Sequence, residues 1–162
     1  MRIFLITITY PPEIGGAAHL IHELALGLQK RGHNVTVLTG FPNYHLSQIP
    51  EKYHQGSRLN EQMDGIHVRR IRFMQMPPDS MVGRGLQHFI YGIWLTILSA
   101  VPPRPDVALV FSPPLPLPWM ICLQGKLRRT PVVVNIQALF PREAVELGVL
   151  TNRLLINLFE RM

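Results

Sequence analysis

The first forty residues constrain the fold more than any other part of the chain. Residues 3–8 are a run of apolar and β-branched side chains, which predicts a strand buried on both faces. Between Leu20 and Leu28 apolar residues recur at helical spacing, and residues 34–40 form a second apolar run. A strand reached through a helix is expected to lie parallel to the first, with a right-handed crossover. The sequence therefore predicts an α/β protein with an open parallel sheet and helices on both faces.

The loop between this first strand and helix contains two prolines and a glycine pair, Gly15 and Gly16. It joins the carboxyl end of a strand to the amino end of a helix, where free N–H groups and the helix dipole favour a phosphate or carboxylate. The alternative is a tight turn in which the glycines adopt positive φ angles. Adjacent glycines do not match the G-x-G-x-x-G spacing, so a nicotinamide-dependent enzyme is not indicated.

Further loops are predicted at the same edge of the sheet. Asn43 and Tyr44 follow the second strand. Ser112 follows a third apolar strand over residues 107–111, and Gln137 follows a fourth. Because the carboxyl ends of parallel strands share one edge, we expect these residues to line a common ligand site.

The segment between the second strand and the next predicted strand has no clear period. Residues 46–65 are mostly polar and are predicted to form a long irregular loop. Residues 66–73 then alternate apolar with basic side chains, which predicts a strand with one solvent-exposed face. Arg69, Arg70 and Arg72 are expected on that face, either solvated or directed toward an anionic surface.

Residues 86–101 carry no charge and predict a helix about 24 Å long, shorter than the hydrocarbon core of a bilayer, about 30 Å. We do not expect this helix to span a membrane. It is either buried in the domain or lies in the membrane interface with its aromatic rings at headgroup depth. In the second arrangement the membrane contacts are Arg84, Phe89, Tyr91 and Trp94.

Composition limits the partners. The net charge of +6 and the pI near 10.1 favour anionic partners, but no aromatic-and-basic motif supports nucleic-acid binding. Charged residues make up only 16% of the chain, below the usual quarter or so, which indicates an apolar surface. The single cysteine, Cys122, fits a reducing compartment.

Sequence motifs of several enzyme classes are absent. There is no P-loop, nucleophile elbow, H-E-x-x-H motif or paired-cysteine zinc spacing in the sequence. His19 and His22 are three residues apart and can share a helix face, but no third ligand is evident nearby. No metal site and no nucleic-acid partner are therefore expected.

Longer motifs, taken together, resemble one enzyme family. They are YPPEIGGAA (10–18), HELA (22–25), KRGHNVTVLTG (30–40), FPNY (41–44), SPP (112–114) and NIQALFPREAVELG (135–148). In this order and spacing they resemble the opening of family 4 glycosyltransferases of the GT-B fold. Within that family they look most like the colanic-acid and O-antigen transferases, including the N-acetylfucosamine transferase type.

The resemblance implies a retaining enzyme that moves a sugar from a nucleoside diphosphate donor, expected to be UDP-linked, to a lipid-linked saccharide acceptor. It further implies cell-surface polysaccharide synthesis at the cytoplasmic face of the membrane, without a cofactor. In that fold two Rossmann-like domains face each other, and residues 1–162 correspond to the first, acceptor-side domain.

The second, nucleotide-sugar-binding domain has no counterpart in this chain, so we expect no sugar transfer by the chain alone. The alternative is a non-catalytic, membrane-associated subunit that completes a separate donor-binding chain.

The resemblance also assigns residues. Gly15 and Gly16 correspond to the loop that approaches the donor phosphate or sugar, and Gln137 corresponds to a histidine or glutamine that faces the sugar. Gln137 is therefore the candidate catalytic residue. The full substrate-binding set is Gly15, Gly16, His19, Asn43, Tyr44, Ser112 and Gln137. Ala138 stands where the close branch has aspartate, and a methyl group can neither accept a hydrogen bond nor carry charge, which leaves catalytic competence open.

Overall fold

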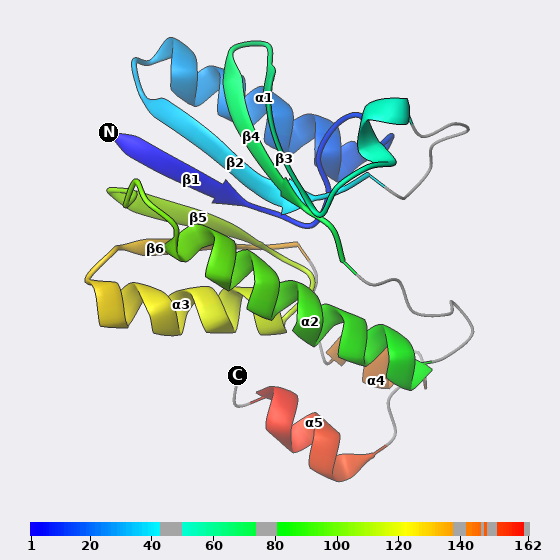
Figure 1. Ribbon diagram of the computed structural model, residues 1–162. Helices are drawn as coiled ribbons and strands as arrows, with labels where there is room; N and C mark the ends of the chain where they lie inside the picture. The colour runs from blue at the N-terminus through cyan, green and yellow to red at the C-terminus, as the bar shows by residue number, and fades with distance from the viewer. Residues whose placement is uncertain (43–49, 74–80, 138–141, 147, 149–151, 161–162) are drawn as a thin grey trace.

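The structure, a computed structural model, describes residues 1–42, 50–73, 81–137, 142–146, 148 and 152–160. Its centre is a six-stranded sheet with the strand order β3-β4-β2-β1-β5-β6 (Figure 1). The strands are β1 (Arg2–Ile6), β2 (Asn34–Gly40), β3 (Arg58–Met63), β4 (Ile66–Ile71), β5 (Val107–Ser112) and β6 (Val132–Ile136). The helices are α1 (Gly16–Lys30), α2 (Met81–Ala100), α3 (Pro116–Arg128), α4 (Arg142–Glu146) and α5 (Arg153–Glu160), and Glu51–Tyr53 form a short 3-10 helix, η1.

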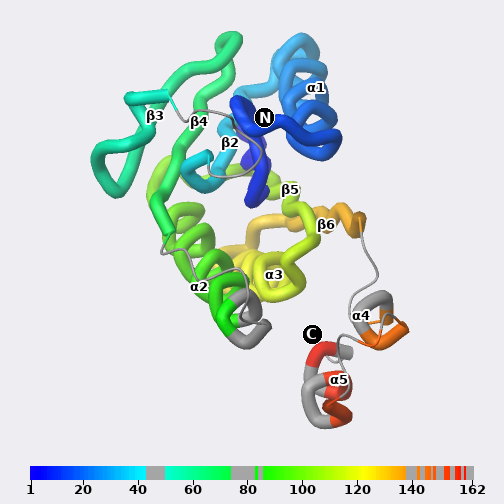
Figure 2. The backbone as a smooth tube through the Cα atoms, turned by 90° about the vertical axis from the view of Figure 1, so that its right-hand side faces the viewer, coloured from blue at the N-terminus to red at the C-terminus, as the bar shows by residue number. Residues whose placement is uncertain are grey.

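The predicted α/β class and parallel sheet are confirmed. Among the described strands, β1, β2, β4, β5 and β6 run parallel to one another, and β3 is antiparallel to β4, with which it pairs. Helix α1 covers one face of the sheet, while α2 and α3 cover the other, as the side view shows (Figure 2). Each face has its own apolar cluster because successive side chains of a strand point to opposite sides.

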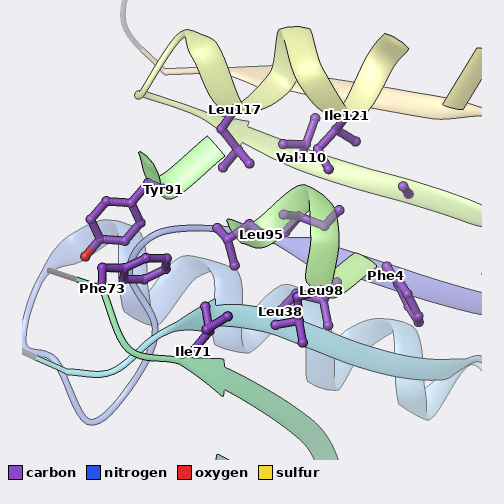
Figure 3. Packing of buried hydrophobic residues seen from close by; sticks show 12 residues of the cluster. Phe4, Leu38, Ile71, Phe73, Tyr91, Leu95, Leu98, Val110, Leu117 and Ile121 are labelled. Atoms are coloured by element: carbon purple, nitrogen blue, oxygen red, sulfur yellow. The ribbon is translucent and has the colours of Figure 1, made fainter. Parts of the chain in front are cut away.

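The alternation along β1 illustrates how the two clusters form. Phe4 and Ile6 belong to the cluster beneath α2 and α3, while Ile3 and Leu5 belong to the cluster beneath α1. Figure 3 shows the first cluster, in which Leu95 of α2 lies among residues from the sheet and α3. Burial on both faces explains why this strand is a continuous apolar run rather than an alternating one.

The prediction of an irregular loop over residues 46–65 is wrong for its described part. Here the chain forms η1 and then β3, and β4 returns along β3 in a hairpin whose turn is Asp64 and Gly65. Both turn residues have positive φ angles, 50° and 80°, which suit the two-residue hairpin turn that an Asp-Gly pair favours. That dipeptide was the available sequence signal for the hairpin.

Helix α2 begins at Met81 rather than at residue 86, and its two sides differ. Tyr91, Leu95 and Leu98 are buried against the sheet, whereas Trp94 is 40% and Ile97 44% exposed. The buried arrangement therefore holds for one side of the helix, and the other side is an apolar surface. Among the described residues, no helix combines the length and apolar character needed to cross a membrane.

The expectation that Tyr91 lies at headgroup depth is wrong. Its ring packs on Phe73 in the core, with the two ring centroids 3.6 Å apart (Figure 3). Residue 91 is on the same side of the helix as the core residues Leu95 and Leu98, four and seven positions further on, and this spacing directs it at the sheet.

Candidate functional site

The carboxyl ends of the parallel strands lie at one edge of the sheet (Figure 1). The loop of residues 10–16, here called the glycine loop, follows β1 at this edge, and Phe41 follows β2. Ser112 ends β5, and its carbonyl oxygen accepts a hydrogen bond, 3.1 Å long, from the backbone N–H of Gln137 after β6. The edge therefore gathers segments that are far apart in the sequence.

The glycine pair has no conformational reason to be glycine. Gly15 is extended, with φ −178°, and Gly16 is not among the glycines with positive φ. A Cβ built on either residue meets no described atom within 4 Å, and both residues are exposed. The alternative of a tight turn requiring positive φ is therefore wrong for this loop. The pair opens α1, whose first N–H groups have no acceptor within the helix.

A buried arginine lies behind the glycine loop. Arg70 of β4 is 1% exposed, and its Nε donates to Glu61 Oε1 over 2.6 Å. Its Nη1 donates to the carbonyl oxygen of Gly40 over 3.1 Å, and its Nη2 donates to the carbonyl oxygen of Pro11. One guanidinium thus contacts the glycine loop, the end of β2 and strand β3.

The predicted solvated position of Arg70 is therefore wrong. The alternation of β4 continues without a break, so that residue 70 shares the α1 face with buried Ile66 and Val68. By contrast, Arg69 is half-buried and Arg72 is exposed. Arg72 still donates to the carbonyl oxygen of Gly56 over 2.8 Å.

Glu61 supplies the charge that compensates Arg70. Its carboxylate also accepts hydrogen bonds from Lys52 Nζ at 2.6 Å and from the Tyr53 hydroxyl at 3.0 Å. Burial works to raise the pKa of Glu61, but the hydrogen bonds from Lys52 and Arg70 outweigh it and lower the pKa below its usual range. Glu61 is therefore ionised at neutral pH.

A second polar chain reaches the glycine loop through α1. The Tyr10 hydroxyl lies 2.8 Å from His22 Nδ1, and His22 Nε2 lies 2.9 Å from Asp64 Oδ2 in the hairpin turn. Burial raises the pKa of Tyr10, so its phenol stays protonated. A carboxylate only accepts, so His22 Nε2 donates to Asp64, and in the tautomer with its proton on Nε2 the Nδ1 atom accepts from the Tyr10 hydroxyl. Both ring nitrogens of His22 are thus engaged in the fold.

The two histidines considered as metal ligands, His19 and His22, have different surroundings in the described structure. His19 is exposed in the first turn of α1, and His22 bonds Tyr10 and Asp64 instead. Within the part of the chain that the structure describes, no three His, Cys, Asp or Glu side chains are grouped to hold a metal ion.

With this geometry established, comparison with known proteins identifies the family. A model of the Glycosyl transferase 4-like domain matches residues 15–161, which is most of the chain. The chain belongs to this family. No curated protein sequence matches it.

Solved structures resemble the glycosyl transferase 4-like domain in fold. Sucrose-phosphate synthase from Thermosynechococcus elongatus superposes with a TM-score of 0.54 at 13% identity, covering 94% of this chain and 36% of that one. The catalytic domain of starch synthase IV from Arabidopsis thaliana, bound to ADP and acarbose, gives 0.52 at 12% identity, covering 84% and 34%. These matches show that the domain has the fold found in GT-B glycosyltransferases, and it spans about a third of each of these chains.

The predicted site residues occupy different environments in this glycosyl transferase 4-like domain. Gln137 is exposed at the edge after β6, and Ser112 is buried at the end of β5. Asn43, Tyr44 and Ala138 lie outside the described residues.

The predicted membrane residues also differ from one another. Phe89 is half-buried and Trp94 is exposed, whereas Tyr91 is buried. Arg84 belongs to α2, but its side chain lies outside the description.

Reasoning from the sequence missed the polar groups behind the glycine loop. Neither Glu61 nor Tyr53 was singled out, because each sits in a segment without clear periodicity. The Asp64–Gly65 turn could have revealed β3 and its pairing with β4. The alternation of β4 places Arg70 on the same face as Ile66 and Val68 and Arg69 on the other, but an arginine on an apolar face gives no sign of the partners that allow its burial.

Proposed function

We propose that this domain is the acceptor-side half of a retaining glycosyltransferase. The reaction moves a sugar from a nucleoside diphosphate donor, UDP-linked in our proposal, to a lipid-linked saccharide in cell-surface polysaccharide synthesis. The glycine pair carries the proposal, because the fold itself requires neither residue to be glycine. A bound phosphate or sugar that approaches the backbone does require it, since a Cβ would occupy the same space.

The motifs at residues 10–18 and 135–148 support assignment to the colanic-acid and O-antigen branch, which includes the N-acetylfucosamine transferase type. In this assignment Gln137 faces the transferred sugar, and His19 and Asn43 belong to the substrate-binding set with the glycine pair. The diphosphate leaving group is bound and stabilised by a second, nucleotide-sugar-binding domain. In this proposal residues 1–162 need that donor-binding domain for sugar transfer.

The proposed location is the inner face of the cell membrane. The outward side of α2 exposes apolar residues including Trp94 and Ile97, and α3 exposes Trp119, Leu123 and Leu127. Neither helix contains an acidic residue, while α3 ends with basic side chains. Tryptophan and aliphatic side chains beside cations match the requirements of an anionic bilayer interface.

Alanine substitution in the glycine pair tests the transfer proposal. In a protein that joins this domain to a donor-binding domain, Gly16→Ala should lower kcat/KM for transfer by about 10- to 100-fold, roughly 1.4–2.7 kcal/mol of transition-state free energy. The thermal midpoint should not fall, because the added Cβ meets no described atom. Sugar transfer by the isolated chain, or full transfer by the variant, would refute the proposal.

Gly27→Ala is the matched control for this experiment. Gly27 lies in the same helix, and a Cβ there meets only Arg31 Nη1, at an ordinary 3.7 Å. Transfer should be unchanged in this variant, and the thermal midpoint should rise slightly, because alanine has the higher helix propensity. A loss of transfer equal to that of Gly16→Ala would show that the pair has no special role.

A second candidate is a non-catalytic, membrane-associated subunit that completes a separate donor-binding chain. Strand β6 favours it, because Val133, Val134 and Ile136 are 53%, 36% and 64% exposed although strands of parallel sheets are normally covered on both faces. Mixing the purified chain with a purified donor-binding chain tests this candidate. Transfer restored only by the mixture favours the subunit, and no complex on size-exclusion chromatography excludes it.

A further inference from the structure

The β3–β4 hairpin is connected to two adjacent residues of the glycine loop, one directly and one through a side chain of α1. Arg70 of β4 donates to the carbonyl oxygen of Pro11, and Asp64 of the hairpin turn reaches Tyr10 through His22. These are two separate chains of contacts, one through a guanidinium and one through an imidazole. Both end at the start of the glycine loop, with residues 12–14 between them and the glycine pair.

Arg70 also connects the glycine loop to the end of β2. Its Nη1 donates to Gly40, the last residue of β2, while its Nη2 donates to Pro11. Because the guanidinium is planar and its N–H groups point in fixed directions, the two carbonyl oxygens are held at a defined separation. The loop that begins after Gly40 contains Asn43 and Tyr44, which belong to the proposed substrate-binding set.

Several groups hold the guanidinium in place. Glu61 accepts from Arg70 Nε, and the Arg70 guanidinium lies 5.2 Å from the centroid of the Tyr53 ring. Tyr53 and Lys52 in turn donate to the Glu61 carboxylate. The arginine is thus contacted by strand β3 through Glu61 and by helix η1 through Tyr53.

Stability alone does not explain this arrangement. Replacing a buried ion pair by apolar residues of similar size is often neutral or stabilising, because the charges no longer have to be desolvated. The bonds of Arg70 instead determine where the glycine loop lies relative to the end of β2. A transferase needs such precision, because small displacements of a substrate-binding group cost rate.

We propose that the β3–β4 hairpin positions the glycine loop for sugar transfer, with Arg70 as the positioning residue that sets this loop relative to the end of β2. Arg70 touches neither donor nor acceptor in this proposal, which rests on the proposed function. The proposal adds a role for residues that are remote from the exposed surface of the loop.

The test uses a variant that removes the two buried charges together; Lys52, which also pairs with Glu61, has a side chain 56% exposed to solvent. Arg70→Met with Glu61→Leu should keep the thermal midpoint within a few degrees, because both buried charges are replaced by apolar side chains. Hydrogen exchange in peptides covering residues 12–18 and 39–42 should become at least tenfold faster. Exchange in β5 and α3 should stay unchanged, which separates a local loss of order from global destabilisation.

Arg70→Lys is a second variant, and Arg69→Lys is its matched control. A lysine at position 70 retains the charge, but its ammonium group lacks the planar fork that bridges the two carbonyls. Position 69 is the preceding residue on the same strand, and its side chain bonds the carbonyl oxygen of Val101 over 3.4 Å. Faster exchange in the glycine loop is expected for Arg70→Lys and not for Arg69→Lys.

Kinetics in a protein that joins this domain to a donor-binding domain complete the test. The double variant should lose at least tenfold in kcat at an unchanged thermal midpoint, a result that a purely structural role would not produce. Unchanged exchange in the two loops, or an unchanged kcat, overturns the positioning role. If the unsubstituted protein transfers no sugar, the proposed function fails, and the exchange data alone then decide whether the hairpin orders the loop.

Discussion

On the α1 face of the sheet, buried polar groups connect a hairpin, a helix and a loop, whereas on the opposite face α2 and α3 rest on apolar side chains. Arg70 and Glu61 exemplify the first face, and Leu95, which is fully buried, exemplifies the second. Directional bonds specify positions at little net gain in free energy, while apolar burial stabilises without specifying a loop. Because each face also has its own apolar cluster, the comparison teaches that the α1 face adds directional polar contacts beside the candidate site to a stability that both faces supply.

The largest expected effect comes from removing one member of the ion pair. Glu61→Ala leaves the guanidinium of Arg70 buried without its carboxylate, and we expect a loss of about 3–5 kcal/mol in the free energy of unfolding. Urea denaturation measures the loss. Glu51→Ala, at an exposed position in η1, is the control and should change stability by less than about 0.5 kcal/mol. Equal effects of the two substitutions would show that the buried Arg70–Glu61 pair has no special importance for stability.

The apolar face should respond to a cavity. Leu95→Ala is expected to cost about 2–5 kcal/mol, because Leu95 is fully buried between the sheet and α3. We expect a loss of about 3 kcal/mol in the free energy of unfolding. Hydrogen exchange in the glycine loop that occurs through local opening should be unchanged. Leu127→Ala, at a position 78% exposed, should be nearly neutral in the same denaturation experiment. Selective loosening of the loop by Leu95→Ala would show that the two faces are coupled.

A smaller effect is expected at the outer apolar surface. Replacing Trp94 and Trp119 together by serine should weaken binding to vesicles that contain anionic lipid by about tenfold, because each ring is only partly exposed and loses about 1 kcal/mol or less of burial in the interface. Flotation with anionic and neutral vesicles measures this. Tyr91→Phe, in the core, keeps the ring and should bind as the unsubstituted chain does. Absence of binding to either vesicle by the unsubstituted chain would contradict the proposed location.

The smallest effect concerns acid. Because the pKa of Glu61 is lower in the folded chain than its ordinary value, its ionised form contributes stability above the ordinary pKa. That contribution disappears as the pH falls through the folded-state pKa, below about pH 4.5. The stability difference between the unsubstituted chain and Glu61→Gln should therefore shrink on going from neutral to acidic pH in denaturant titrations. A difference independent of pH would show that ionisation of Glu61 does not contribute.

The sequence allowed the elements with strong local periodicity to be predicted, and these define most of the fold. The apolar runs at residues 3–8 and 107–111 are strands, and the helical spacing between Leu20 and Leu28 marks α1. The parallel direction of these strands was predicted from the helices between them, because a helical crossover returns the chain to the same edge of the sheet. The candidate site was located in part for the same reason, because strand ends and loops can be assigned to one edge without knowing any side-chain contact.

The remaining features depended on contacts between distant residues. Burial of Arg70 requires Glu61 from the neighbouring strand and the carbonyl oxygens of Gly40, at the end of β2, and of Pro11, 59 positions away in the glycine loop. Likewise Tyr91 is a core residue because Phe73, which follows β4, packs against its ring on the same face of the sheet. The sequence by itself determined which segments are strands and helices, because periodicity is a local property. Only the tertiary structure decided which charged and aromatic groups are interior, because that depends on which partners the fold brings within bonding distance.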